Sequence, residues 1–254
     1  LKGRIVQHLV YKEKADEEQH VSLDDIDFYR PQMRLALRNC GVIDPENIDE
    51  YIAFDGYKAL AKVLTEMTPE QVIAEVLKSG LRGRGGAGFP THVKISSAVG
   101  KADTIIINGA ECEPYITADH RLMLEHGEKI IGGVRFIMKA LQLDHAYIGI
   151  EDNKMDAVNH LKELVGGAKD ITVQALRTRY PQGAEKQLIQ AITGREVPPG
   201  KLPADVGCCV FNAATTAAIY DAVALGLPVY QRVITITGSA VKNPVTVSYT
   251  HLRA

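Results

Sequence analysis

The chain has 254 residues, of which 46% are hydrophobic and 24% are charged, a composition typical of a soluble globular protein with one large or two small domains. Its formal net charge of −2 at pH 7 leaves no basic stripe that would neutralise nucleic-acid phosphates. No stretch approaches the roughly 20 apolar residues that cross a bilayer. We therefore expect no nucleic-acid partner and no direct membrane span.

The four cysteines are Cys40, Cys112, Cys208 and Cys209. None of them forms the C-x-x-C spacing that cluster and zinc sites commonly use. We therefore expect no metal site in this chain. Cys208 and Cys209 lie in an apolar stretch, and consecutive side chains of a strand point to opposite faces, so we expect buried thiols there rather than a redox pair.

The two ends of the chain look cut. The chain begins with Leu1, and the closing string Val247–Ala254 resembles the translated read-through of a sequencing-library adaptor. We expect that string to have no role in folding, and we set residues 245–254 apart as an artefactual tail.

Residues 1–79 are predicted to be a charged segment followed by a small helical lead-in. Up to Asp27 the chain carries charge runs and little apolar periodicity, which predicts low order. Residues 31–78 read as helical. The clearest helix begins at Thr68, an N-cap followed by Pro69 and by Gln71 in a capping box, and Gly80 is suited to end it.

Residues 80–244 are predicted to form one α/β domain. Short apolar runs alternate with amphipathic ones, which indicates βαβ units and a mostly parallel, helix-covered sheet. The predicted strands are Thr104–Ile107, Ala146–Ile150, Ile171–Leu176 and Val206–Val210. The predicted helices are Leu122–Leu141, Met155–Leu164, Glu185–Ile192 and Thr215–Leu225.

A glycine-rich loop opens this domain. Gly83, Gly85 and Gly88 match G-x-G-x-x-G, and Gly86 adds a further glycine. The usual dinucleotide fingerprint follows a strand, whereas this loop follows the helix that begins at Thr68, so the ordinary Rossmann interpretation fails. One alternative is a flexible turn. We favour an anion-binding concavity, because the loop also carries Arg82 and Arg84.

Polar residues follow the predicted strands at the edge where parallel α/β sheets bind ligands. Each group alone is as well explained by a solvated turn, but their joint placement at successive strand ends favours a binding site. The groups are Asn108, Glu111, Glu113 and Tyr115 after the first strand, Tyr180, Gly183 and Glu185 after the third, and Asn212 and Thr215 after the fourth.

Two family resemblances become specific at this point. The loop Leu81–Thr91 resembles the flavin loop of the NADH-binding flavoprotein subunit of respiratory complex I and of NAD-dependent hydrogenases, as do residues 38–45 and 55–60. From Thr91 onward the chain resembles RnfC, a component of ion-translocating ferredoxin:NAD oxidoreductases. The matching stretches are Asn108–Tyr115, Tyr180–Glu185 and Val197–Pro203.

One resemblance ends and the other begins within Gly85–Thr91, where the two families have almost the same sequence. We therefore hypothesise that the chain is a chimera of two joined genes. A full-length read showing one continuous gene with the same junction would contradict this. The RnfC resemblance also implies that the chain lacks the amino-terminal domain, the small β domain and the cluster-binding region of its parent.

The resemblance implies an FMN- and NADH-binding core with a complex I flavoprotein-subunit-like fold. The glycines would shape the flavin loop, Phe89 would offer an aromatic surface, and Lys94 would reach the flavin. The remaining implied contacts are Asn108, Glu111, Glu113, Gly183, Glu185, Asn212 and Thr215. The complex I pattern has an aspartate at Ala110 and paired acids at Ala184 and Glu185, so contacts inferred from complex I do not transfer directly there.

The implied reaction is hydride transfer between NAD(H) and FMN, with the protein binding and tuning the cofactors rather than supplying a catalytic acid or base. The resemblance implies 4Fe-4S clusters in the parent but not in this chain. Its partners would be the other subunits of an Rnf-type complex, with a peripheral place on the cytoplasmic face of the bacterial membrane. The alternatives are the NADH-binding subunit of complex I or a hydrogenase, a non-catalytic ligand-binding relative, and a non-functional hybrid.

Overall fold

The computed structural model describes residues 11–12, 19–20, 39, 41–44 and 46–250. The chain divides into two units, Leu1–Phe54 and Asp55–Ala254. In the first unit, β1 (Tyr11–Lys12) pairs antiparallel with β2 (Gln19–His20), and α1 (Ile48–Ala53) is capped by Asn47. Most of the charged segment to Asp27, the start of the lead-in up to residue 38 and Cys40 lie outside the described residues.

The second unit opens with two helices, α2 (Lys58–Thr65) and α3 (Pro69–Lys78). The predicted capping box is confirmed: Thr68 Oγ1 accepts from the Gln71 N–H at 3.3 Å, and Gln71 Oε1 accepts from the Thr68 N–H at 2.9 Å. Gly80 follows with φ +70°, a left-handed conformation that favours glycine. The loop therefore begins where the sequence pattern places it.

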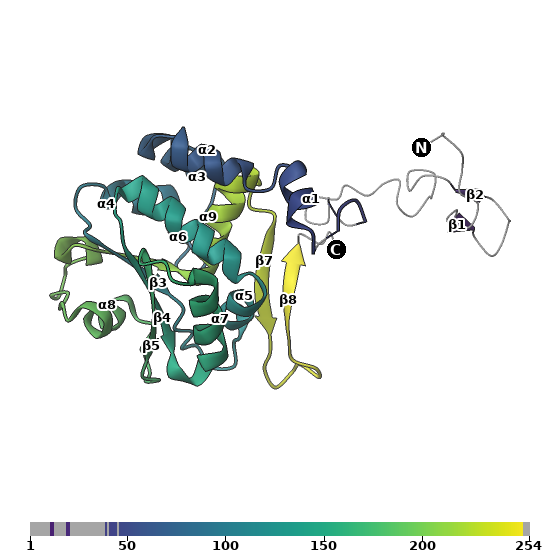
Figure 1. Cartoon of the computed structure of the whole chain (residues 1–254). Helices are drawn as coiled ribbons and strands as arrows, with labels where there is room; N and C mark the ends of the chain where they lie inside the picture. Colours follow the sequence, from purple (N-terminus) through teal and green to yellow (C-terminus); the bar gives the residue numbers. More distant parts are fainter. Residues whose placement is uncertain (1–10, 13–18, 21–38, 40, 45, 251–254) are drawn as a thin grey trace. The chain divides into compact units, whose positions relative to one another are not determined.

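A four-stranded parallel sheet forms the centre of this unit (Figure 1). The strand order is β5-β4-β3-β6, so the chain runs outward from β3 to β5 and then crosses back to place β6 on the other side of β3. The strands are β3 (Thr104–Asn108), β4 (Ala146–Glu151), β5 (Ile171–Leu176) and β6 (Cys208–Asn212). In the register of β3 and β6, Asn108 lies opposite Asn212.

Both faces of the sheet are buried. Ile105 and Ile107 of β3 belong to the larger core, which includes residues of α6 (Gly127–Leu141), α7 (Met155–Val165) and α9 (Ala213–Leu225). Ile106 points to a smaller core built with α8 (Glu185–Thr193). Figure 1 shows α8 on one side of the sheet and α6 and α7 on the other. The predicted α/β fold with a parallel, helix-covered sheet is confirmed.

The helices of the described residues differ from the sequence prediction in three respects. The single predicted helix over residues 122–141 is two helices, α5 (Ala118–Glu125) and α6, which meet at His126. Beyond this break Gly127 packs closely against α7, where an added Cβ would lie 2.6 Å from Leu164 Cδ1. Helix α4 (Thr91–Ala98) was not predicted, and two short 3-10 helices are also present, η3 (Asp152–Lys154) and η4 (Pro203–Val206).

The end of the described chain is an antiparallel hairpin of β7 (Gln231–Ile236) and β8 (Val245–Thr250). The sequence prediction set residues 245–254 apart as an artefactual tail. In the structure residues 245–250 form β8, and the alternating Val245, Val247 and Tyr249 suit a strand that pairs with β7. Among the described residues, no helix is long and apolar enough to span a bilayer.

Candidate functional site

The glycine-rich loop is closed by hydrogen bonds at its base. The Gly83 N–H donates to the Phe89 carbonyl at 2.8 Å, and the Thr91 N–H donates to the Leu81 carbonyl at 3.1 Å. At its tip, Gly86 adopts φ +110°, a conformation that an L side chain rarely reaches. The loop follows α3 rather than a strand, as the sequence analysis inferred, and it leads into α4.

The loop lies against the start of α9. The Arg84 N–H donates to Thr215 Oγ1 at 2.8 Å, and a Cβ added to Gly85 would contact Asn212 Cβ at 3.3 Å. Asn212 is the N-cap of α9, where its Oδ1 accepts from the Thr215 N–H at 3.2 Å. The loop residues Arg84 and Gly85 therefore meet Asn212 and Thr215 where β6 ends.

Lys94 joins three elements of the site. Its Nζ donates to Glu185 Oε1 of α8 at 2.7 Å and to the Val210 carbonyl of β6 at 2.8 Å. The Lys94 and Glu185 side chains are 32% and 44% exposed, so water screens this ion pair and both groups stay available to a ligand. The structure thus brings together two residues that are 91 positions apart in the chain.

Asn108 anchors the loop that precedes α8. Its Nδ2 donates to the Gly183 carbonyl at 2.8 Å, and its Oδ1 accepts from the Ala110 N–H at 3.1 Å. A Cβ added to Gly183 would lie 2.3 Å from the Ala110 carbonyl oxygen, so only glycine permits this approach. The polar turns after β3 and β5 are consequently in direct contact.

The turn after β3 carries a buried carboxylate, Glu111, whose side chain is 2% exposed. It accepts from the N–H groups of Asp119 and His120 at 2.9 and 3.3 Å. Lys154 Nζ lies 3.5 Å from Glu111 Oε2. Glu111 therefore holds the start of α5 in place rather than facing solvent.

Asp119 is a site residue that sequence reasoning missed. Its Oδ2 accepts from Asn212 Nδ2 at 2.7 Å. Burial, followed by the neighbouring Glu111 carboxylate, raises the pKa of Asp119 to about 6. The sequence did offer one signal, an acidic residue shortly after the polar turn that follows β3. Because the next helix was expected to begin at Leu122, Asp119 was not placed in it.

The side chains of Phe89 and Glu113 stand apart from this network. Both residues are exposed, and so is the neighbouring Tyr115 at 83%. Their place on the loop and on the turn after β3 is as predicted, but the structure does not tie them to the contacts around Asn212.

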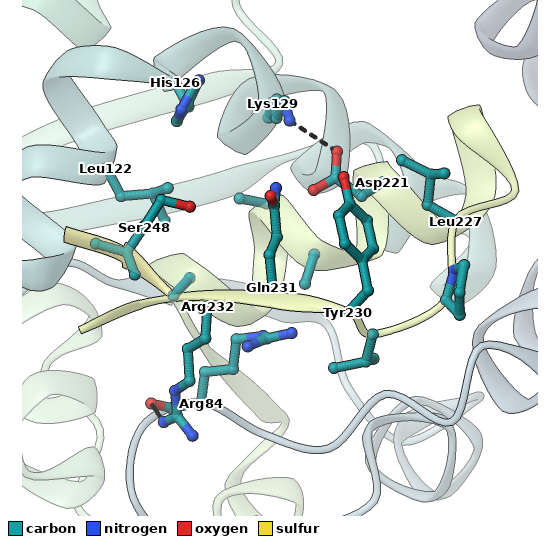
Figure 2. A pocket seen from close by; sticks show the side chains of 16 residues that line it. Arg84, Leu122, His126, Lys129, Asp221, Leu227, Tyr230, Gln231, Arg232 and Ser248 are labelled. Carbon is teal, nitrogen blue, oxygen red and sulfur yellow. Dashed lines mark hydrogen bonds and ion pairs between the residues drawn. The ribbon is translucent and has the colours of Figure 1, made fainter. Parts of the chain in front are cut away.

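A small cavity of about 70 Å³ adjoins the glycine loop under β7 (Figure 2). Arg84 and Arg232 line it on one side of the strand, and Lys129 and Asp221, which pair at 2.9 Å, line it on the other. Arg232 Nη2 donates to the Arg84 carbonyl at 3.1 Å. Sequence reasoning did not identify Arg232 or Lys129, because both lie far along the chain from the loop.

The cavity has an excess of positive charge. Burial, and then the nearby Arg232, lower the pKa of Arg84. Among the described residues, no hydrogen-bond partner reaches the buried Nε of Arg84. Asp221, which pairs with Lys129, acts in the opposite direction on the pKa of Arg84, and its single negative charge faces three cations, Arg84, Arg232 and Lys129.

The two adjacent cysteines are buried, as predicted. Burial raises the pKa of Cys209 to about 12, which keeps this thiol protonated and unreactive at neutral pH. Within the ranges that the structure describes, no cluster of His, Cys, Asp or Glu side chains has the arrangement of a metal site.

These features define the class of domain to which the chain belongs. The polar groups and the glycine loop gather at the carboxyl ends of β3 and β6, where the strand order reverses. Parallel α/β domains bind nucleotide-like ligands at such a place. The comparison with protein families is more specific: the Nuo51 FMN-binding domain matches residues 76–221. The chain belongs to this family.

Curated relatives agree with the RnfC resemblance. The chain is 49% identical over 185 residues to the C subunit of the Na(+)-translocating ferredoxin:NAD(+) oxidoreductase complex of Acetobacterium woodii, covering 72% of this chain and 42% of the relative. It is 47% identical over 204 residues to the proton-translocating counterpart of Clostridium ljungdahlii, covering 80% and 44%. The chain thus spans less than half the length of these relatives.

Among solved structures, an NAD+-reducing [NiFe]-hydrogenase in the H2-reduced state matches with a TM-score of 0.66 and 22% identity, covering 86% of this chain and 41% of that chain. This likeness concerns the fold alone. The 204-residue match to the Clostridium protein omits only about 50 residues of this chain and so includes the Gly85–Thr91 junction. RnfC similarity therefore extends to both sides of the junction, and the chimera stays a hypothesis.

Proposed function

We propose that this chain binds FMN at the carboxyl ends of β3 and β6, and that it exchanges a hydride between NAD(H) and FMN as part of an Rnf-type ferredoxin:NAD oxidoreductase. The observation that carries the proposal is the convergence of the glycine loop, Lys94, Asn108, Glu185 and Asn212 at one edge of the sheet. Membership of the FMN-binding domain family supports FMN as the ligand.

The residues fit a flavin phosphate. A phosphate carries close to two negative charges at neutral pH, and Arg84 and Arg232 supply positive charge in excess of the single carboxylate of the cavity lining. At about 70 Å³ the cavity suits a group of that size but not an isoalloxazine ring. We assign the phosphate to this cavity beside Arg84 and Arg232, with Thr215 holding the Arg84 backbone in place.

The other residues would hold the rest of the cofactor. Gly83, Gly85, Gly86 and Gly88 let the loop backbone approach closely, while Lys94 and Glu185 offer a partly exposed cation and carboxylate. When bound, FMN supplies both hydride and single-electron chemistry. Lys94 donates hydrogen bonds from Nζ, and Asn108 keeps the Gly183 loop in position.

NAD(H) would use the exposed part of the site. Phe89 offers an aromatic face on the glycine loop, and Glu113 offers a carboxylate on the turn after β3. Exposed groups of this kind suit a ligand that binds and leaves in each turnover, whereas a retained cofactor needs the fixed contacts around Asn212.

The relatives' names support an assignment of partners and location. Both relatives are called subunits of Na(+)-translocating or proton-translocating complexes, so we assign this chain to the component that meets NAD(H) on the cytoplasmic face of the membrane. The 4Fe-4S clusters that accept electrons from FMN would lie in the remaining length of the parent protein.

A flavin titration tests the proposal. Quenching of FMN fluorescence by the purified chain should saturate at one equivalent, and anaerobic NADH should bleach the bound flavin. Lys94→Ala should weaken FMN binding, and Lys101→Ala, at an exposed lysine, is the matched control. Saturable FMN binding without NADH bleaching would point instead to a non-catalytic ligand-binding relative. A chain that binds no FMN would contradict the proposal.

A further inference from the structure

The carboxyl group of Asp119 lies directly behind the N-cap of α9. Asp119 Oδ2 accepts from Asn212 Nδ2 at 2.7 Å, while Asn212 Oδ1 accepts from the Thr215 N–H at 3.2 Å. Both ends of the Asn212 amide are therefore occupied. An amide held at both ends has one orientation, since neither a flip nor a rotation keeps both bonds.

The fixed Asn212 supports the glycine loop. Its Cβ is the atom closest to a Cβ added at Gly85, at 3.3 Å, and Thr215 Oγ1 accepts from the Arg84 N–H at 2.8 Å. A continuous path of contacts thus runs from Asp119 through Asn212 and Thr215 to the loop. The path joins three segments that are distant in the chain.

Two charged groups face Asp119. Glu111 comes from the turn after β3 and Lys154 from η3. The Lys154 Nζ lies 3.5 Å from Glu111 Oε2, so two carboxylates share one ammonium group. The other groups that act on the Asp119 carboxyl are uncharged: the Asn212 side chain of β6 and the Ala214 N–H of α9. Where β7 contacts α5, Thr235 Oγ1 accepts from the Thr117 N–H at 3.1 Å, so β7 brings an uncharged hydroxyl to this end of α5.

The flanking residues of α5 do not supply the missing positive charge. His120 Nε2 contacts the Asp156 carboxylate at 2.9 Å, and Arg121 pairs with Glu125. Of the carboxyl groups around the start of α5, Glu111, Asp156 and Glu125 each have an ion-pair partner. Among the described residues, no basic side chain forms an ion pair with Asp119. A bound dianion near the start of α9 would add repulsion to an ionised Asp119.

We propose that Asp119 is a positioning residue for FMN, which holds Asn212 against the glycine loop and whose ionisation loosens FMN binding as the pH rises. The inference rests on the proposed FMN site and adds that the affinity of this site for FMN depends on pH. The direction follows from charge. Negative charge on FMN favours the protonated carboxyl, so affinity falls as Asp119 ionises near pH 6.

The test compares the full-length wild type with Asp119→Asn and Asp119→Ala by FMN fluorescence titration between pH 5 and 8. Free FMN also titrates in this range, but that contribution is common to all the proteins compared, so the ratio to Asp119→Asn isolates this residue. We expect wild-type affinity to fall about fivefold more than that of Asp119→Asn between pH 5 and pH 7.5, because an ionised Asp119 repels the phosphate through partly screened surroundings.

Asp119→Ala separates positioning from charge. It removes the acceptor for Asn212 Nδ2, so FMN affinity should fall about tenfold at pH 5 as well. Asp119→Asn keeps an acceptor oxygen and should restore affinity at pH 5. Asp144→Asn, at an exposed acid outside this network, is the matched control and should behave like the wild type at every pH.

A second measurement needs neither FMN nor the alanine variant. In the ligand-free protein, the side-chain NH₂ resonances of Asn212 should shift with a midpoint near pH 6 and should not do so in Asp119→Asn. Parallel pH profiles in wild type and Asp119→Asn, or an Asn212 amide insensitive to pH, would overturn the inference. If the wild type binds no FMN, the proposed site fails, and the Asn212 titration still decides the link to Asp119.

Discussion

The two halves of the candidate site differ in how firmly they are held. The anchored half consists of Asn108, Asn212, Thr215 and Gly183. Asn108 bonds to Gly183 and Thr215 bonds to Arg84, which are distant in the chain, and Asn212 caps the helix that contains Thr215. The open half, Phe89, Glu113 and Tyr115, presents exposed side chains. The difference teaches that one edge of the sheet carries both fixed and free side chains, which is what the proposal of a retained FMN and an exchanging NAD(H) requires.

The physical reason lies in the backbone. Asn108 and Asn212 of the anchored half end parallel strands, and Asn212 also caps α9, so their backbones are already fixed and their side chains have few alternatives. Residues of the open half lie on a loop and a turn, where ordering a side chain costs entropy that only a bound ligand would offset. Mutations in the two halves should therefore have distinct consequences.

The largest effect is expected from Gly183→Ala in the anchored half. The new Cβ would lie 2.3 Å from the Ala110 carbonyl oxygen, so the two turns must separate and the Asn108 bond must break. We expect a loss of about 3 kcal/mol in the free energy of unfolding, with loss of FMN binding. Urea denaturation measures the free energy of unfolding. Gly167→Ala, where a Cβ meets no atom within 4 Å, is the control.

Asp119→Asn should stabilise the ligand-free protein at neutral pH. Because folding raises the pKa of Asp119 from 3.8 to about 6, its ionisation opposes folding, and the cost grows from about pH 4 to pH 6 and is complete above. The variant should be about 2 kcal/mol more stable at pH 7.5. Equal stability of both proteins at pH 4 and pH 7.5 would show that Asp119 is not buried as described.

Lys94→Met should weaken FMN binding about tenfold with little loss of stability. The variant keeps much of the aliphatic stem but removes the donor to Glu185 and Val210. The free energy of unfolding should fall by no more than about 1 kcal/mol, since the ion pair is partly exposed. A large loss of stability with unchanged FMN affinity would show that Lys94 supports the fold and does not bind FMN.

The smallest effect is expected from Glu113→Gln in the open half. Stability and FMN affinity should stay within about 0.5 kcal/mol of the wild type, because the side chain is exposed. The NADH concentration that gives half-maximal flavin bleaching should change about threefold, measured in anaerobic titrations. A strong loss of FMN would instead place Glu113 in the anchored half.

Much of the fold could be predicted from local patterns. The capping box at Thr68, the strand Ile171–Leu176 and the helix stops at Gly194 and Gly226 appear where the sequence indicates them. These signals are local, since they depend on caps, apolar periodicity and left-handed glycines. The division of residues 118–141 into α5 and α6 was missed, and the close packing of Gly127 against α7 beyond this break is a contact that local patterns do not encode.

The site was predictable in part. Strand-end residues such as Asn108 and Asn212 were identified because parallel strands bring their carboxyl ends to one edge. Asp119, Lys154 and Arg232 were not, because their roles depend on contacts with distant segments rather than on a motif.

The sequence by itself determined that the chain is a parallel α/β domain with a glycine loop that does not follow a strand. It also placed polar residues at successive strand ends. Only the tertiary structure decided that, within the described part of the chain, Asp119 lacks an ion pair, Arg84 Nε lacks a hydrogen-bond partner, and Asn212 is held at both ends. Secondary structure follows from neighbours in the chain, whereas charge balance and hydrogen-bond saturation depend on which distant groups the fold brings within a few ångströms.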